Sequence, residues 1–174
     1  MGKKPVALFI GRFQPFHLGH LRALRWIAAK SSKVIVAVGS ADKWLEPENP
    51  FSARERIRMI RAEIGKERHS NRFVVVPLTD VGDNSRWVAH VDAHVPPYDV
   101  AYSNNPLVRR LMQKAGKKVK AIPFFRRRIL DATKIRRRMA EGKKWEDRVP
   151  KKVAEHLKKI DAERRVREIV ASRS

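Results

Sequence analysis

Short runs of β-branched residues alternate with segments of helical periodicity over about the first 125 residues of the chain. The runs are mostly uninterrupted by polar residues, which is typical of strands buried on both faces of a parallel sheet. Strands are predicted at Val6–Ile10, Val34–Val38, Phe73–Val76, Val100–Tyr102 and Val119–Ile122. Helices are predicted at about Leu18–Lys30, Ser52–Ile64, Ser85–Val95 and Pro106–Ala115. Since parallel strands need right-handed crossovers, the pattern predicts an α/β fold with a doubly wound, mostly parallel five-stranded sheet that binds ligands at the carboxyl ends of its strands.

Beyond these strands the periodicity is helical only, first around Thr133–Glu141 and then from Pro150 to Ile160. Proline suits a first helical turn because its φ angle is already close to the helical value. The chain has 174 residues, of which 43% are hydrophobic, and this is enough to bury one core. We therefore expect a single domain over residues 1–174, with a core at about 5–125 and a helical C-terminal part at about 126–174.

The composition excludes several classes of protein. The chain has no cysteine, so a disulfide framework and thiol-based catalysis are excluded. No stretch approaches the roughly 20 apolar residues of a membrane-spanning helix, and the N-terminus lacks the apolar region of a signal peptide. A soluble, cytoplasmic protein without a membrane partner is expected. The net charge of +22 fits either a nucleic-acid surface or the attraction of small polyanions such as nucleotides.

The segment Gly11–His20 lies between the first predicted strand and the first predicted helix. Gly11 ends the strand where backbone must pass close to a ligand, and Gly19 keeps side-chain bulk away from the start of the helix. At a helix N-terminus, backbone N–H groups point toward an anion and the helix dipole favours negative charge. The segment therefore predicts a phosphate-binding turn.

Two histidines of this segment, His17 and His20, lie one helical turn apart on one face. From there they can donate hydrogen bonds to a triphosphate and stabilise charge that develops during displacement at phosphorus. A zinc site is an alternative interpretation. However, metalloprotease helices space their histidines four apart around a glutamate, and the sequence offers no third ligand nearby.

The same segment resembles the signature of the nucleotidylyltransferase superfamily, which it matches at every fixed position: Gly11, Phe13, Pro15, His17, Gly19 and His20. The resemblance implies a Rossmann-like fold that transfers a nucleotidyl group from ATP or CTP to a phosphate or hydroxyl, with release of pyrophosphate. The superfamily's second motif, Ser/Thr-x-x-Arg, is matched by Thr133 and Arg136.

Later segments resemble, more narrowly, the archaeal type of nicotinamide mononucleotide (NMN) adenylyltransferase, over nearly the whole chain from Leu8 to about Ile160. The matching stretches are residues 39–41, 49–56, 84–88, 96–99, 102–109, 133–139 and 144–146. This resemblance implies transfer of AMP from ATP to the 5′-phosphate of NMN, which gives NAD and pyrophosphate. It also implies a homo-oligomer and Mg²⁺ as the cofactor, held by the ATP phosphates rather than by protein side chains.

Carried over residue by residue, the resemblance divides the expected site into three sets. The expected catalytic residues are His17, His20, Arg12 and Arg136. The residues expected to bind ATP and its phosphates are Gly11, Phe13, Gly19, Thr133, Arg137, Ser103 and Asn105. The residues expected to bind NMN are Gly39, Ser40, Asn84, Trp87 and Arg56. By the same resemblance, Arg12 and Arg56 are expected to hold a phosphate of the mononucleotide or of the triphosphate. The indole of Trp87 suits the cationic nicotinamide ring, which it can attract by stacking and cation–π interaction.

Two segments depart from the pattern of the relatives. Asp131 and Ala132 stand where the relatives usually have Ser-Gly or Ser-Ser, so one hydroxyl contact is missing. Asp131 either caps the following helix or brings a carboxylate toward magnesium. Asn104 stands where the relatives have glycine, a change that a left-handed backbone would tolerate because asparagine accepts that conformation best among the other residues.

The expected reaction is in-line attack by the NMN phosphate on the α-phosphorus of ATP, which needs no general base because a phosphate monoester is already an anion. Three alternatives stay open: another acceptor such as phosphopantetheine, FMN or a polyol phosphate; a basic nucleic-acid-binding module; and a nucleotide sensor without chemistry. Nucleic-acid binding requires aromatic residues among the arginine clusters, and Phe124-Phe125 beside Arg126–Arg128 is the one candidate, so this alternative is disfavoured.

Overall fold

A five-stranded parallel sheet forms the centre of the computed structural model, which describes residues 2–173. The strands are β1 (Val6–Gly11), β2 (Lys33–Val38), β3 (Phe73–Pro77), β4 (Val100–Tyr102) and β5 (Val119–Lys120). Their order is β3-β2-β1-β4-β5, and every neighbouring pair is parallel. The predicted α/β, doubly wound sheet is confirmed, and β5 ends two residues before its predicted limit at Ile122.

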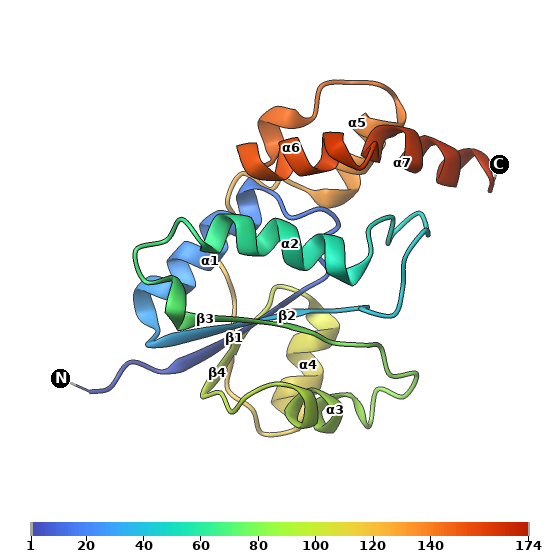
Figure 1. The fold of residues 1–174 in the computed structure, drawn as a ribbon. Helices are drawn as coiled ribbons and strands as arrows, with labels where there is room; N and C mark the ends of the chain where they lie inside the picture. The colour runs from blue at the N-terminus through green and yellow to red at the C-terminus, as the bar shows by residue number, and fades with distance from the viewer. Residues whose placement is uncertain (1, 174) are drawn as a thin grey trace.

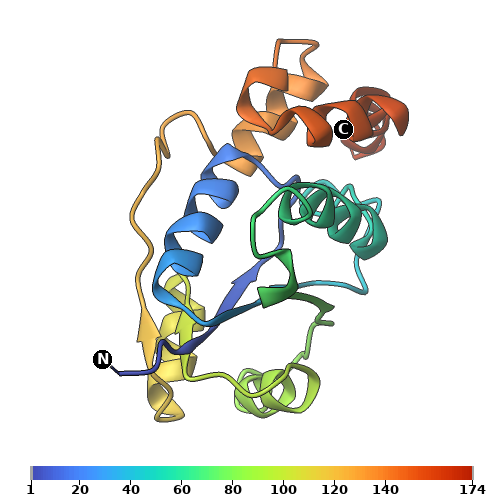
Figure 2. The same cartoon turned by 60° about the vertical axis from the view of Figure 1, so that its left-hand side comes forward.

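Helices cover both faces of this sheet (Figures 1 and 2). The helices that follow the first four strands are α1 (Leu18–Lys30), α2 (Ala53–Ile64), α3 (Trp87–His94) and α4 (Pro106–Lys114). Figure 1 shows α1 and α2 on one face and α3 and α4 on the other. Within β1, Ala7 and Phe9 belong to the core under α1 and α2, whereas Leu8 belongs to the core under α3 and α4. Both faces of the strand are therefore buried, which explains why its sequence is apolar without alternation.

Three further helices complete the fold: α5 (Ala132–Ala140), α6 (Lys151–Lys159) and α7 (Ala162–Ala171). Figure 1 shows them beside α2, on the side of α2 away from the sheet. Val153 and Leu157 of α6 belong to the same buried cluster as the α2 residues Met59 and Ile60. Short 3₁₀ helices lie at Ser70–Arg72 and Glu146–Arg148. None of the helices in residues 2–173 is long and apolar enough to cross a membrane.

An ion pair joins the C-terminal helices to the start of α2. Arg165 of α7 donates from Nη1 to both carboxylate oxygens of Glu55, at 2.9 and 2.8 Å. Glu55 also accepts from the backbone N–H of Ser52, the residue that caps α2. The N-terminus of α2 is thereby fixed from two sides, close to the carboxyl ends of β1 and β2.

Candidate active site

A cavity of about 460 Å³ lies at the carboxyl ends of the strands, between the turn after β1, the segment after β4 and the start of α5. Most of the residues expected at the catalytic and phosphate positions line it: Gly11, Arg12, Phe13, His17, Gly19, His20, Ser103, Asn105, Thr133 and Arg136. Arg137 does not line it and is exposed. The structure thus brings two motifs together although more than 100 residues of chain separate His20 from Thr133.

His17 and His20 form a reciprocal cap at the N-terminus of α1, in which each side chain accepts a hydrogen bond from the backbone of the other residue. His17 accepts from the backbone N–H groups of Gly19 and His20 through Nδ1, at 3.1 and 3.3 Å. In return, the backbone N–H of His17 donates to Nδ1 of His20 at 3.2 Å. Because a neutral imidazole has one donor and one acceptor nitrogen, these bonds place the ring hydrogen of each histidine on Nε2. Both residues line the cavity, so both can donate to a ligand there.

The imidazoles of His17 and His20 are held in the neutral state. Burial lowers the pKa of His17 to about 4, against a smaller opposing effect of Asp131. Burial also lowers the pKa of His20 well below its usual value, and the positive charge of a protonated His17 would lower it further. The rings stack with their centroids 3.6 Å apart, which two imidazolium cations would not do without repulsion. As neutral imidazoles, the two side chains can serve a ligand as hydrogen-bond donors rather than as cations.

Glycine at position 19 is required by the ring of His17. A Cβ atom there would lie 2.9 Å from two atoms of that ring, a distance at which something must shift. At Gly11 a Cβ would lie 2.8 Å from the ring of Phe13, which is buried and has a φ of 54°. The glycines of the motif thus make room for the motif's own rings, in addition to the ligand access that the sequence suggested.

Gln14, which the sequence did not single out, fixes the Gly11–His20 turn to the loop that precedes α2. Its amide donates to the backbone carbonyl of Phe51 at 2.8 Å and accepts from the backbone N–H of Phe51 at 3.0 Å. Gln14 is buried, and its own backbone carbonyl accepts from Nη1 of Arg136 at 2.8 Å. A polar residue between Phe13 and Pro15 gives no sequence signal of burial, which is why this role was not foreseen.

Arg136 reaches the cavity from α5. Its guanidinium donates to the carbonyls of Gln14 and Pro47 and to the hydroxyl of Thr133, the last at 3.4 Å. Burial, followed by the charge of Arg12, lowers the pKa of Arg136 from its ordinary value. Arg12 and Arg127 also line the cavity, and three cationic side chains suit a ligand with several negative charges.

Asp131 caps α5, since its carboxylate accepts from the backbone N–H of Lys134 at 3.0 Å. Capping was one of the two roles that the sequence left open for this residue. Asp131 also lines the cavity, so its carboxylate lies beside the expected phosphate site.

Asn104 and Asn105 hold the end of β4. Asn104 donates from its amide to the carbonyl of Ile122 and accepts from the N–H of Ile122, at 2.8 and 2.9 Å. Its φ is not positive, so the left-handed backbone considered for this position does not occur; the amide bridge accounts for asparagine instead. Asn105 caps α4 by accepting from the N–H groups of Leu107 and Val108.

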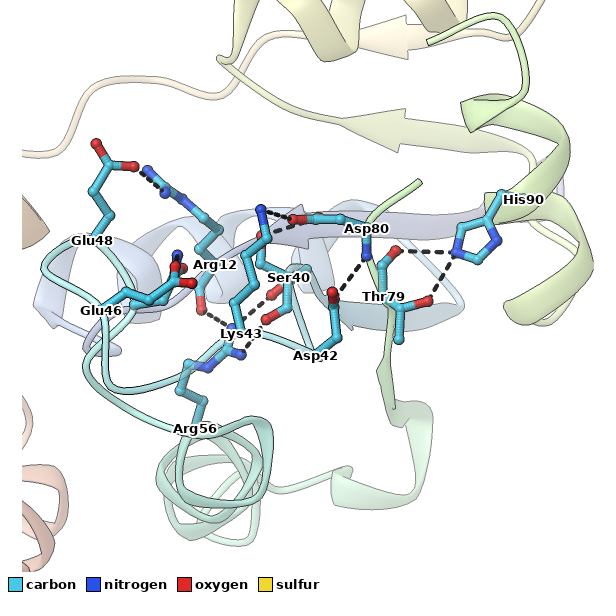
Figure 3. Close-up of polar contacts among 12 residues, drawn as sticks. Arg12, Ser40, Asp42, Lys43, Glu46, Glu48, Arg56, Thr79, Asp80 and His90 are labelled. Atoms are coloured by element: carbon cyan, nitrogen blue, oxygen red, sulfur yellow. Dashed lines mark hydrogen bonds and ion pairs between the residues drawn. The ribbon is translucent and has the colours of Figure 1, made fainter. Parts of the chain in front are cut away.

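Arg56 differs from its expected position. Its side chain is completely buried and does not line the cavity. The guanidinium donates to the carbonyls of Arg12 and Gly39, both at 2.7 Å, and to that of Ser40 at 2.9 Å (Figure 3). Burial, and then the nearby charge of Arg12, lower the pKa of Arg56 to about 10. In this structure Arg56 joins the carboxyl ends of β1 and β2 and contacts backbone, where a phosphate contact had been expected.

The other residues expected to bind NMN lie outside the cavity, at the ends of β2 and β3. Gly39 and Ser40 follow β2, whereas Asn84 and Trp87 belong to the loop and first turn that lead into α3. Asn84 is exposed, and Trp87 is half-buried against the core under α3. These residues share the sheet edge with the cavity but do not form one hollow with it.

Polar contacts that the sequence analysis missed surround Ser40 (Figure 3). Its hydroxyl donates to Asp80 at 3.0 Å, and Asp80 forms an ion pair with Lys43 at the same distance. The backbone N–H of Asp80 donates to Asp42 at 2.9 Å. Asp80 lies shortly after β3, at the same edge of the sheet as Ser40. Only the order of the strands shows that these two residues are neighbours, so the sequence alone did not single out Asp80.

Comparison with known sequences places the chain in a family. Residues 8–138 match the cytidylyltransferase-like family, and the chain belongs to that family. Within it, the chain belongs with the nicotinamide-nucleotide adenylyltransferases. It is 47% identical to the one from Archaeoglobus fulgidus over 167 residues, which are 94% of this chain and 96% of that relative. It is 45% identical to the one from Methanosarcina mazei over 168 residues, or 97% and 96% of the two chains. The resemblance seen in the sequence is confirmed.

A solved structure confirms the fold. A bifunctional NMN adenylyltransferase/ADP ribose pyrophosphatase from Francisella tularensis, complexed with AMP and a manganese ion, superposes with a TM-score of 0.79 at 23% sequence identity. The match covers 98% of this chain and 52% of that one, so this chain spans about half of the bifunctional protein.

Proposed function

We propose that the cavity is where this protein transfers the adenylyl group of ATP to the 5′-phosphate of NMN, forming NAD and pyrophosphate. The observation that supports this site most strongly is the meeting of two helix N-termini, those of α1 and α5, at one cavity. Helix N-termini, neutral imidazole donors and arginines suit the phosphates of a nucleotide.

In the proposed mechanism, the Nε2–H groups of His17 and His20 donate to phosphate oxygens of ATP. Hydrogen-bond donors that are fixed before the reaction stabilise the charge that develops at phosphorus without further reorganisation. His20, whose ring lies against the rings of both Phe13 and His17, is the proposed donor to the transition state. Arg12 binds a phosphate of NMN or of ATP. Thr133 and Arg136 hold the departing pyrophosphate, and Gly11, Phe13, Gly19, Ser103 and Asn105 shape the walls around ATP.

Mg²⁺ is the proposed cofactor. Asp131 supplies one carboxylate to the cavity, and a hard cation with one protein carboxylate and several phosphate and water ligands is a common arrangement for Mg²⁺. The residues present therefore fit an ion that is held mainly by the substrate's phosphates. When bound, the ion supplies charge neutralisation between phosphate oxygens.

The reaction is tested by supplying ATP with each candidate acceptor: NMN, phosphopantetheine, FMN or a polyol phosphate. We expect NAD and pyrophosphate in equal amounts from NMN alone. After treatment with a chelator, Mg²⁺ should restore at least as much NAD synthesis as the same concentration of Mn²⁺. Product from another acceptor but not from NMN would contradict the proposed substrate and keep nucleotidyl transfer. Restoration by Mn²⁺ alone would contradict the proposed metal.

Trp87 is the proposed platform for the nicotinamide ring, with Asn84, Gly39 and Ser40 beside it at the sheet edge. Trp87→Ala should raise the KM for NMN about tenfold through loss of stacking and cation–π attraction. The kcat and the KM for ATP should stay close to those of the unchanged protein. Trp87→Phe is the matched control, because it keeps an aromatic face and should recover most of the loss. An unchanged KM for NMN in Trp87→Ala would place the ring elsewhere.

Four features stay predictions: the cytoplasmic location, the homo-oligomeric state, the single domain with its limits at about 5–125 and 126–174, and the contact of Arg137 with ATP.

A further inference from the structure

The loop between β2 and α2 contains a closed four-residue turn, Glu46–Asn49. The backbone N–H of Asn49 donates to the carbonyl of Glu46 at 3.0 Å, and the N–H of Glu46 donates to the carbonyl of Asn49 at 3.3 Å. The amide of Asn49, which is buried, also donates to the carboxylate of Glu46 at 3.1 Å. Three bonds across four residues make this turn stiff, so its outer side chain, Glu48, is held in place at its base.

Two of the three arginines that line the cavity, Arg12 and Arg136, are bonded to this turn. Arg136 donates from Nε to the carbonyl of Pro47 at 3.1 Å. Arg12 donates from Nη1 to the carboxylate of Glu48 at 3.0 Å (Figure 3). The backbone of Arg12 is itself fixed, because its carbonyl accepts from buried Arg56. The Arg12–Glu48 pair therefore joins two anchored segments.

The pair differs from an ordinary surface ion pair in what it occupies. Arg12 lines the cavity, and a guanidinium binds carboxylates and phosphates through the same fork of N–H donors. The carboxylate of Glu48 is bonded to one N–H group of that fork, at Nη1, and so occupies a donor that a phosphate oxygen would use. The side chain of Glu48 is 73% exposed and that of Arg12 is 50% exposed, so water can reach the pair and an incoming anion can separate it.

We propose that Glu48 is an internal competitor for the phosphate site: its carboxylate binds Arg12 in the absence of substrate and must be displaced by a nucleotide phosphate. This inference rests on the proposed role of Arg12 as a phosphate-binding residue. An incoming phosphate dianion displaces the carboxylate more readily than an incoming monoanion does, because the dianion is attracted more strongly to the guanidinium. Glu48 thus weakens binding of every anion at Arg12, favours substrates with a terminal phosphate and assists product release. It is a specificity-determining residue and takes no part in the chemical step.

The test compares Glu48→Gln with Glu46→Gln, which removes one negative charge from the same turn at a residue bonded to Asn49 rather than to Arg12. Glu48→Gln should lower the KM for NMN or for ATP about three- to fivefold, the range that an exposed ion pair supports, with kcat unchanged or reduced. Binding of pyrophosphate, measured by calorimetry, should strengthen by a similar factor. Glu46→Gln should leave both quantities unchanged.

The direction of the effect separates competition from support. If Glu48 merely held Arg12 in position, its removal would raise the KM and weaken pyrophosphate binding, and either result overturns the inference. Equal tightening by Glu46→Gln also overturns it, because the effect would then be one of general charge. In an Arg12→Ala background Glu48→Gln should have no effect on either quantity, and a persisting three- to fivefold effect would show that Glu48 acts elsewhere.

Arg12→Ala alone distinguishes failure of the inference from failure of its basis. If Arg12→Ala leaves both KM values and pyrophosphate binding unchanged, the proposed role of Arg12 is wrong, and the inference falls with it. If Arg12→Ala weakens binding but Glu48→Gln does not strengthen it, the role of Arg12 stands and the competition by Glu48 is rejected.

Discussion

Replacement of His20 by alanine is expected to lower kcat about 100- to 1,000-fold, the usual cost of removing one fixed donor to a transition state. The Nδ1 atom of His20 is bonded to the backbone N–H of His17, so the remaining Nε2–H is the group that the ligand would lose. NMN binds farther along the sheet edge in our proposal, and its KM should change far less than kcat. Steady-state kinetics with each substrate varied in turn measure both quantities.

Two further variants control this experiment. His69→Ala removes an exposed histidine far along the chain from the cavity and should leave kcat unchanged. His20→Gln keeps an amide that can accept or donate, and should recover part of the lost turnover. Thermal unfolding of His20→Ala checks that loss of the helix cap has not unfolded the protein. Equal losses in kcat and in NMN affinity would mean that His20 binds the mononucleotide and has no special role in the transition state.

The fold was predictable because the sequence pattern that specifies it is local. Uninterrupted apolar runs such as Val34–Val38 specify strands covered on both faces, and the structure places Ile35 and Val36 in opposite cores. Limits were missed where side chains compete with the helix. The predicted start of α3 at Ser85 is wrong by two residues, because the backbone N–H of Ser85 donates to the carboxylate of Asp83 and the helix begins at Trp87.

The two motifs at the cavity were predictable as well, because each lies within a few residues of a helix start that the sequence itself indicates. Their partners were not. Gln14 is bonded to Phe51 and Arg12 is bonded to Glu48. Both Phe51 and Glu48 lie in the loop between β2 and α2, whose path the sequence does not specify. Arg56 was expected to bind phosphate, but its guanidinium is bonded to backbone carbonyls. A sequence shows that a residue is cationic but does not show whether its charge faces a ligand or the carbonyls of neighbouring strands.

Arg56→Met is expected to lower the free energy of unfolding by about 3 kcal/mol, because it leaves buried carbonyls without the charged donor that satisfies them. The carbonyls of Arg12, Gly39 and Ser40 lose their bonds together, and they lie where β1 and β2 reach the site. Methionine has nearly the same length and keeps the packing volume, so the loss reports hydrogen bonding rather than a cavity. Urea unfolding followed by circular dichroism measures it.

Arg54→Met is the matched control, since Arg54 lies on the same helix but is exposed and should change the free energy of unfolding by less than about 0.5 kcal/mol. The comparison also decides between the two roles considered for Arg56. Replacing a residue that binds phosphate would raise the KM for a nucleotide. It would leave the free energy of unfolding unchanged or increase it, because residues that serve binding often do not contribute to stability. Replacing a residue that joins β1 to β2 would instead lower the free energy of unfolding. Full stability with a raised KM in Arg56→Met would therefore return Arg56 to the phosphate site, and would require its guanidinium to leave the three carbonyls when substrate binds.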